Sequence, residues 1–414
     1  MEELIEKGRL AKQAAAKLAL LSADSKNEAL RMAAAALEGH TEYILAENKA
    51  DIDAARENGM NEGLIDRLML NADRIKAIAE GVRQIATLPD PIGEVLSEVK
   101  RPNGLHIGKM RVPLGVCGII YEARPNVTAD AAALCLKSGN ACILRCGKEA
   151  HRSSMAITKV IRGAIKGAGL PEDAVSLVED TSRESAVALM KLNKYLDVII
   201  PRGGAGLIRA VVENATVPAI ETGTGNCHVY VDESADFEMA KNIIINAKTS
   251  RPSVCNAEEK LLVNCKIADA FLSQMLPALI EKGVEIVGDE AVCRICPNAT
   301  LATADDWDEE YLALKIGVKV VEGIDAAIEH INCHGSRHSE AIITESYEKA
   351  QRFLEEVDAA AVYVNASTRF TDGFEFGFGA EIGISTQKLH ARGPMGLEAL
   401  TTTKYIIRGN GQIR

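Results

Sequence analysis

The sequence has little of what membrane-bound or nucleic-acid-binding proteins need. Aromatic residues make up only 4% of the chain, too few for the stacking platforms that hold single-stranded nucleic acid. The 47 Lys and Arg residues are outnumbered by 58 Asp and Glu, leaving a net charge of −11, which disfavours a polyanion as partner. Apolar runs such as Leu114 to Tyr121 stop far short of the roughly 20 residues that span a bilayer. We therefore expect no nucleic-acid partner and no membrane partner.

A secretory signal is also missing from the amino-terminal segment. Glu2, Glu3 and Glu6 stand where such a signal needs a basic start and an uncharged core. The 10 cysteines are dispersed along 414 residues, whereas a disulfide framework is typical of short secreted chains. We expect a soluble protein of the reducing cytoplasm.

The length of 414 residues suits two or three domains at about 150 residues each. The first hundred residues have helical periodicity. Ser25-Lys-Asn-Glu28 has the pattern of a capping box, and two further helices are predicted over residues 41–59 and 71–87, the second stopped by Pro89 and Pro91.

The pattern changes near Arg111 to short apolar runs separated by helical stretches such as 129–137 and 151–167. This alternation is typical of βαβ units in a parallel sheet covered on both faces. Two such series predict an α/β fold of two doubly wound domains, with strands over 115–121, 142–145, 174–178, 196–200, 260–263, 315–321, 341–343 and 361–364. The segments 101–109 and 401–414 fit neither series and read as strands that pair with another element or another subunit.

A glycine turn, Pro201-Arg-Gly-Gly-Ala-Gly206, follows one predicted strand and leads into a helical pattern. Backbone N–H groups at a helix N-terminus bind phosphate well. The spacing matches neither G-x-G-x-x-G nor a Walker loop, so a simple tight turn explains the glycines equally well.

Cys255 lies in a Pro-interrupted segment beside Arg251. A neighbouring cation favours the thiolate, which is the competent nucleophile, although most cysteines in such a set serve as small buried hydrophobes. Glu221 precedes Cys255 by 34 positions in a Gly-rich turn, either as a general base or as an ordinary loop acid.

Other clusters are less specific. Cys293 and Cys296 have metal-ligand spacing but lack a second ligand pair. The histidines at 330, 334 and 338 suit either a helical metal face or a turn of hydrogen-bonded rings, and the turn is favoured because Gly335 and Ser336 interrupt the helix. Seven arginines near turns are candidates for binding anions, namely Arg111, Arg124, Arg202, Arg251, Arg369, Arg392 and Arg408.

Several segments in a fixed order along the chain resemble the gamma-glutamyl phosphate reductase (glutamate-5-semialdehyde dehydrogenase) family of the aldehyde dehydrogenase superfamily. The resemblance runs from the amino-terminal helices to the last residues. It is carried by the segments Val112 to Asp130, Lys137 to Asn140, Ile200 to Gly204, Arg251-Pro252 with Cys255-Asn-Ala257, Ala327 to Glu340, Asn365 to Phe370 and Ile384 to Pro394.

This resemblance implies the activity and the domain plan. It implies NADPH-dependent reduction of L-glutamate 5-phosphate to L-glutamate 5-semialdehyde and phosphate in proline biosynthesis, through a thioester on Cys255. It also implies a dinucleotide-binding domain over 1–100 and 112–228, rejoined by 366–395, a catalytic domain over 229–365, and oligomerisation segments over 101–111 and 396–414. A homo-oligomer and association with glutamate 5-kinase are the implied partnerships.

The resemblance also implies roles for individual residues. Asn126 would donate to the oxyanion with the backbone of Cys255, and Arg124 and Arg251 would bind the phosphate or the α-carboxylate of the substrate. At the adenosine ribose many members of the superfamily have Lys and then Glu, whereas this chain has Arg145 and Lys148. Two cations there predict NADPH over NADH, because they favour the 2′-phosphate that a carboxylate would repel. The residues implied to contact the cofactor are Arg145, Lys148, Gly203, Gly204, Glu221 and Glu310.

Two other functions compete with this one. A hydrolytic aldehyde dehydrogenase would use Glu221 as its general base and need no phosphate. A catalytically silent binding protein would keep the fold without turnover, and the intact Cys255-Asn-Ala257 segment argues against it.

Overall fold

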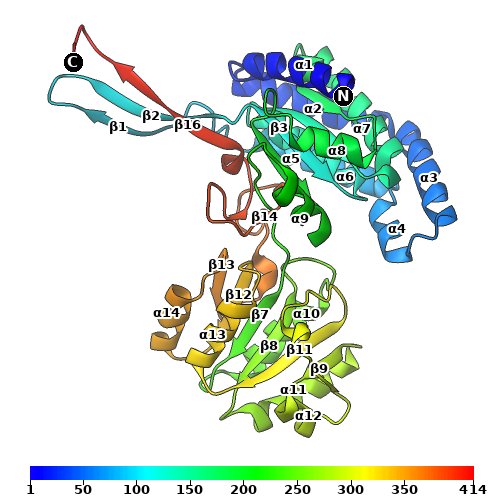
Figure 1. The fold of residues 1–414 in the computed structure, drawn as a ribbon, viewed down its shortest axis with the longest axis vertical. Helices are drawn as coiled ribbons and strands as arrows, with labels where there is room; N and C mark the ends of the chain where they lie inside the picture. Colours follow the sequence, from blue (N-terminus) through cyan, green and yellow to red (C-terminus); the bar gives the residue numbers. More distant parts are fainter. The chain divides into compact units, whose positions relative to one another are not determined.

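The computed structural model describes residues 1–414 and divides into two compact units (Figure 1). The first unit comprises Met1–Glu221, Gly377–Gly383 and Met395–Arg414. The second comprises Thr222–Phe376 and Ile384–Pro394. Each contains a parallel sheet with helices, which confirms the predicted α/β class. None of the α-helices combines the length and the apolar content required to cross a bilayer.

Five helices, rather than the three predicted, precede the first strand: α1 (Glu2–Leu18), α2 (Ala23–Gly39), α3 (Thr41–Glu57), α4 (Glu62–Leu68) and α5 (Ala72–Thr87). The predicted cap of α2 is wrong. Ser22 is the N-cap, and its Oγ accepts from the Ser25 backbone N–H at 3.2 Å. Ser22 is an equally good capping residue one turn earlier, and Asp24 in the first turn favours the longer helix through the helix dipole.

The sheet of the first unit has four parallel strands in the order β5-β4-β3-β6. The chain runs outward from β3 to β5 and then returns to β6 on the other side of β3. Such a reversal places a crevice at the carboxyl ends of β3 and β6, between which the strand order changes direction. The elements are β3 (Val116–Tyr121), α6 (Pro125–Lys137), β4 (Ala141–Cys146), η1 (Lys148–Ala150), α7 (His151–Gly167), η2 (Glu172–Ala174), β5 (Val175–Leu177), α8 (Arg183–Met190), β6 (Val198–Arg202) and α9 (Ala205–Asn214).

A separate antiparallel sheet in the order β1-β2-β16 belongs to the first unit. It joins β1 (Val95–Lys100), β2 (His106–Pro113) and β16 (Thr401–Arg408), and every residue of β16 pairs with one of β2. In Figure 1 the red carboxy-terminal strand runs beside the cyan pair. The two segments that fitted neither predicted series therefore pair with each other.

The second unit has seven parallel strands in the order β10-β9-β11-β8-β7-β12-β13. Successive residues of β7 face opposite sides, so Val229 and Val231 pack in one apolar core and Tyr230 in the other. The elements are β7 (Cys227–Val231), α10 (Phe237–Thr249), β8 (Glu258–Asn264), α11 (Ala268–Glu281), β9 (Glu285–Gly288), α12 (Glu290–Ile295), β10 (Thr300–Leu301), η3 (Asp305–Trp307), β11 (Lys315–Val321), α13 (Ile324–His334), β12 (Ser339–Ile343), α14 (Tyr347–Glu356), β13 (Ala361–Val364) and η4 (Thr368–Phe370).

The units differ from the predicted domains in two segments. Residues 222–228 were expected in the first domain but belong to the second unit. Residues 366–395 were expected to rejoin the first domain as a block, whereas only Gly377–Gly383 does so. Ile384–Pro394 belongs to the second unit, where β14 (Ile384–Ser385) pairs with β15 (Gly393–Pro394). The Gly223 N–H donates to the Ile384 carbonyl at 2.9 Å, which ties this hairpin to the chain that leads into β7. The turn η5 (Glu398–Leu400) precedes β16.

Candidate active site

Cys255 lies in the loop between α10 and β8, at the amino end of β8, and is half-buried. Helix α10 ends at Thr249 because Pro252 disfavours helical backbone in the residue before it and cannot donate an N–H to the helix. The loop therefore starts where the sequence predicts it. Strands β7, β8, β11 and β12 begin on this edge of the sheet, so the loops that precede them meet around Cys255.

The backbone of Gly225 packs directly against Cys255. A Cβ atom added at Gly225 would lie 1.5 Å from the Cys255 carbonyl oxygen, so only glycine fits there. The Gly225 N–H donates to Glu310 Oε1 at 2.6 Å, and the thiol of Cys227 donates to the Cys255 carbonyl at 3.1 Å. The structure thus brings Glu310, expected to bind the nicotinamide ribose, to the backbone that packs against Cys255.

Asn256, next to Cys255, is buried and joins the loop to the segment after β13. Its amide donates to the carbonyls of Arg369 at 3.2 Å and Thr371 at 2.9 Å. The backbone carbonyl of Asn256 accepts from Thr368 Oγ1 at 2.8 Å. Asn256 is part of a motif that carried the family resemblance, but the sequence assigned it no role, because hydrogen bonds across 112 or more positions leave no local pattern.

Arg369 also contacts the Cys255 loop, although the sequence did not distinguish it among seven arginines. Its guanidinium donates to Asn256 Oδ1 and, at 3.2 Å, to Ser250 Oγ. Burial lowers the pKa of Arg369, and the charge of Arg251 lowers it further, while Asp372 and, to a smaller extent, the Cys255 thiol act in the opposite direction. Two cations therefore lie near Cys255, the candidate nucleophile, and the Asn365–Phe370 motif was the sequence signal for the second.

A buried pair lies at the start of β7 and β12. Glu340 Oε2 accepts from the His228 backbone N–H at 2.7 Å and lies 3.1 Å from His228 Nδ1. Burial lowers the pKa of His228 to about 3, assisted by Lys260, and burial raises the pKa of Glu340 well above its usual range. Both shifts have the same cause and disfavour the charged forms of the two side chains.

The other predicted site residues lie in the first unit, at the carboxyl ends of its strands. The Gly204 N–H, at the start of α9, donates to Glu122 Oε2 at 2.9 Å. A Cβ atom at Gly203 would lie 2.7 Å from the same carboxyl group. The turn therefore accepts an anionic oxygen at a helix N-terminus, which is the environment that a cofactor phosphate needs, and Gly203 and Gly204 fit that role.

The two cations expected at the adenosine ribose differ in availability. Arg145 Nη2 donates to the carbonyls of Thr181 at 2.8 Å and Ser182 at 3.1 Å, so its guanidinium is held by the chain. Lys148, at the start of η1, is exposed and forms no ion pair. Of the two, Lys148 is the one able to meet a ligand.

Asn126, Arg124 and Glu221 also belong to the first unit, and Glu221 is its last residue before the second. Asn126 Nδ2 donates to Asp130 Oδ2 at 3.2 Å within α6. Burial raises the pKa of Asp130 to about 6, against the effects of Asn126 and Arg202. Arg124 is the N-cap residue of α6. Arg251 and Glu310 share the second unit with Cys255.

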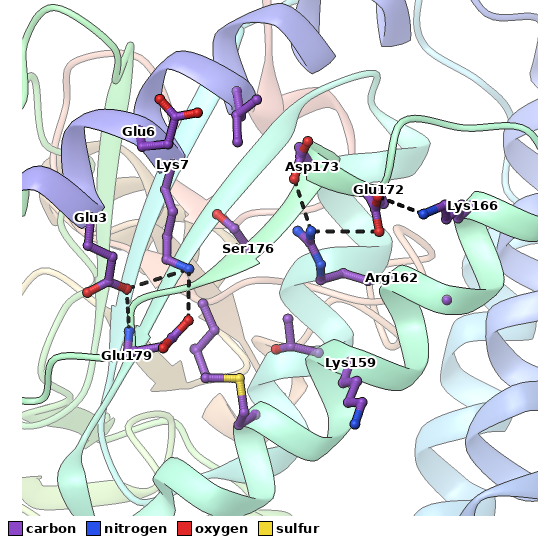
Figure 2. A pocket seen from close by; sticks show the side chains of 15 residues that line it. Glu3, Glu6, Lys7, Lys159, Arg162, Lys166, Glu172, Asp173, Ser176 and Glu179 are labelled. Carbon is purple, nitrogen blue, oxygen red and sulfur yellow. Dashed lines mark hydrogen bonds and ion pairs between the residues drawn. The ribbon is translucent and has the colours of Figure 1, made fainter.

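A surface pocket of about 720 Å³ lies elsewhere in the first unit, among residues of α1, α7 and the η2–β5 segment (Figure 2). Its charged side chains satisfy one another. Arg162 pairs with Asp173 at 2.9 Å, and Lys166 pairs with Glu172 at 2.9 Å. None of the predicted site residues lines this pocket. No group of three or more His, Cys, Asp or Glu residues is arranged to hold a metal ion.

Comparison with known proteins first shows the broad protein family to which this chain belongs. The aldehyde dehydrogenase family profile matches residues 2–300. An engineered glycolyl-CoA reductase with bound NADP⁺ has the same fold, with a TM-score of 0.69 at 17% identity over 97% of this chain and 96% of that one.

Closer relatives narrow the class. The gamma-glutamyl phosphate reductases of Clostridium botulinum (strain Eklund 17B / Type B) and Caldicellulosiruptor bescii are 63% and 61% identical to this chain, with full coverage of both chains in each comparison. The crystal structure of gamma-glutamyl phosphate reductase from Thermotoga maritima has a TM-score of 0.97 at 50% identity and 100% coverage of both chains. The chain therefore belongs to the gamma-glutamyl phosphate reductases of the aldehyde dehydrogenase family.

Proposed function

We propose that this chain reduces L-glutamate 5-phosphate to L-glutamate 5-semialdehyde and phosphate with NADPH, in the synthesis of proline from glutamate. The observation that carries the proposal is the setting of Cys255, on a loop held by Gly225 and Asn256 beside two guanidinium groups. The names of its relatives support the choice of substrate.

The chemistry follows from an activated acyl group next to a thiol. The Cys255 thiolate attacks the γ-carbonyl carbon, and phosphate leaves with the electron pair of the broken carbon–oxygen bond. The resulting thioester accepts a hydride more readily than a carboxylate would. When bound, NADPH supplies that hydride. Collapse of the thiohemiacetal then releases the semialdehyde and restores the thiol.

The chain's own residues bind and orient the reactants. Gly203 and Gly204 offer the start of α9 to the cofactor's pyrophosphate, and Lys148 favours a 2′-phosphate over a bare ribose. Glu310 is suited to the nicotinamide ribose because it already hydrogen-bonds Gly225, which packs against Cys255. Asn126 and the Cys255 backbone N–H are assigned to the oxyanion. Glu221 is not required as a base, since phosphate needs no activated water.

We also propose that the protein forms a homo-oligomer and works in the cytoplasm. The sheet β1-β2-β16 carries exposed apolar side chains at Val95, Val99, Tyr405 and Ile407, and we assign it to contact with other subunits of a homo-oligomer. None of the 10 cysteines forms a disulfide, which suits work in the reducing cytoplasm.

One assay tests the proposal in the reverse direction: reduction of NADP by glutamate semialdehyde with and without inorganic phosphate. We expect steady turnover only with phosphate, and none in Cys255→Ser or Cys255→Ala. Cys265→Ser, which changes an exposed cysteine, is the matched control and should retain full activity. Turnover at an equal rate without phosphate would indicate the hydrolytic reaction, and substrate binding without turnover would indicate a binding protein.

A further inference from the structure

We propose that Arg369 binds the phosphate group of the acyl phosphate together with Arg251, and thereby makes phosphate rather than water the acyl acceptor in the reverse reaction. This assignment rests on the proposed function. It adds a substrate-binding residue from the segment after β13, which lies more than a hundred positions from the nucleophile.

The position of the Arg369 guanidinium is set by the nucleophile's own loop. Nε donates to Ser250 Oγ at 3.2 Å and Nη1 donates to Asn256 Oδ1. Nη2 makes no hydrogen bond within the protein. Because Ser250 and Asn256 lie on either side of Cys255 in one short loop, the guanidinium is tied to the loop that carries the thiol, and one of its nitrogens keeps both N–H donors for a ligand.

Neither arginine of this pair forms an ion pair within the unit. Elsewhere in the second unit, Arg352 pairs with Asp325 at 2.7 Å and Arg392 with Asp358 at 2.8 Å. Arg251 and Arg369 have no such ion pair. Asp372, just after η4, is close enough for its charge to raise the pKa of Arg369, but its carboxylate forms no ion pair and accepts from the Phe374 N–H at 2.9 Å. Arg251 and Arg369 still repel each other, and a dianion bound between them removes that repulsion.

Phosphate is the group of the proposed substrate that needs this charge. In acylation the Cys255 Sγ–carbon bond forms, the carbon–oxygen bond to phosphate breaks, and the oxygen keeps the electron pair, with no change of oxidation state. Negative charge therefore grows on the leaving phosphate, where a planar guanidinium stabilises it through paired hydrogen bonds. In the reverse direction the same contacts hold phosphate for attack on the thioester.

The experiment separates formation of the thioester from its phosphorolysis. Native enzyme is mixed rapidly with NADP and glutamate semialdehyde without phosphate, and we expect a burst of about one NADPH per subunit because covalent catalysis stops at the acyl-enzyme. Phosphate is then titrated to measure its KM. In Arg369→Gln the burst should persist within about twofold, while the KM for phosphate rises by at least about tenfold. Arg369→Lys should fall between, since its charge lacks the planar fork.

Arg352→Gln, which removes a surface arginine paired with carboxylates, is the control and should behave as native. An unchanged phosphate KM in Arg369→Gln with a native burst would overturn the assignment alone. Loss of the burst together with slower alkylation of Cys255 by iodoacetamide would also overturn it, by showing that Arg369 only supports the loop. A native enzyme without a burst would overturn the thioester route and this assignment together.

Discussion

The α-carbon of Gly225 and the carbonyl of Cys255 are packed so closely that no side chain fits between them: a Cβ atom at Gly225 would lie 1.5 Å from the Cys255 oxygen. The same glycine donates its N–H to Glu310. Gly225 therefore fixes the position of the Cys255 loop through close backbone packing, and it holds Glu310, a proposed cofactor-binding residue, through a hydrogen bond.

Gly225→Ala should displace the Cys255 loop and lower kcat by about a hundredfold or more, because misplacement of a reacting atom by about 1 Å has that effect. Steady-state kinetics and the rate of Cys255 alkylation measure it. Gly323→Ala is the control in the same unit, since a Cβ atom there meets nothing within 4 Å. A Gly225→Ala enzyme with native kinetics would show that the loop relaxes without consequence.

Glu310→Gln keeps an oxygen that can accept the Gly225 N–H but removes the charge, whereas Glu310→Ala removes the acceptor as well. If Glu310 holds the nicotinamide ribose, both variants should raise the KM for NADPH by about tenfold, the value of a hydrogen bond to a charged group. Only Glu310→Ala should also slow alkylation of Cys255. A cofactor KM that is unaffected in both variants would leave Glu310 with a purely structural role.

Lys148→Glu should weaken NADPH binding by about tenfold or more and NADH binding much less, because a carboxylate repels a 2′-phosphate and accepts from a 2′-OH. The ratio of kcat/KM for the two cofactors measures the effect. Lys17→Glu makes the same change of net charge at an exposed position of α1 and should leave the ratio unchanged. Equal losses for both cofactors would show that Lys148 does not contact the 2′-phosphate.

The buried His228 predicts a pH dependence of stability. In the folded chain its pKa of about 3 lies below the ordinary value of 6.5. Between these two pH values the unfolded chain binds a proton at this histidine and the folded chain does not. The contribution of the neutral His228 to the free energy of unfolding is fully present above pH 6.5 and is lost progressively as the pH falls toward 3. At about 1.4 kcal/mol per pKa unit this amounts to a few kcal/mol.

Urea unfolding of native protein and His228→Gln at pH 7, 5.5 and 4 tests this dependence. The difference in free energy of unfolding between the two proteins should shrink or change sign as the pH falls, because glutamine does not titrate. A difference that stays constant across this range would mean that His228 takes up its proton equally in the folded and unfolded chains.

Removal of residues 401–414 deletes β16 and leaves the inner strand β2 with an unpaired edge. We expect the truncated protein to lose assembly, with a smaller mass by light scattering at equal protein concentration. Tyr405→Lys, which changes an exposed apolar side chain of the same strand but keeps the pairing, should weaken assembly less. An unchanged mass after truncation would discard the role of this sheet in oligomerisation.

Local patterns predicted many elements closely. Residues 151–167 and 315–321 form α7 and β11 with the predicted bounds, and α5 begins after Asn71, one residue from prediction. Their apolar periodicity is strong and their ends carry caps or breakers. Strands β7 and β9 were missed, because β7 begins with Cys227 and His228, a polar start for a buried strand, and β9 spans only Glu285–Gly288.

By itself the sequence determined the α/β class and the family, because these depend on periodicity and on ordered motifs that can be seen in the sequence alone, and the same motifs are the basis on which Cys255 is proposed as the nucleophile. Only the tertiary structure selected Arg369 from seven arginines, gave Gly225 its place against Cys255, and distinguished the exposed Lys148 from the tethered Arg145. Those distinctions arise where loops from distant strands meet at one edge of a sheet, and contacts between residues a hundred positions apart have no local signature.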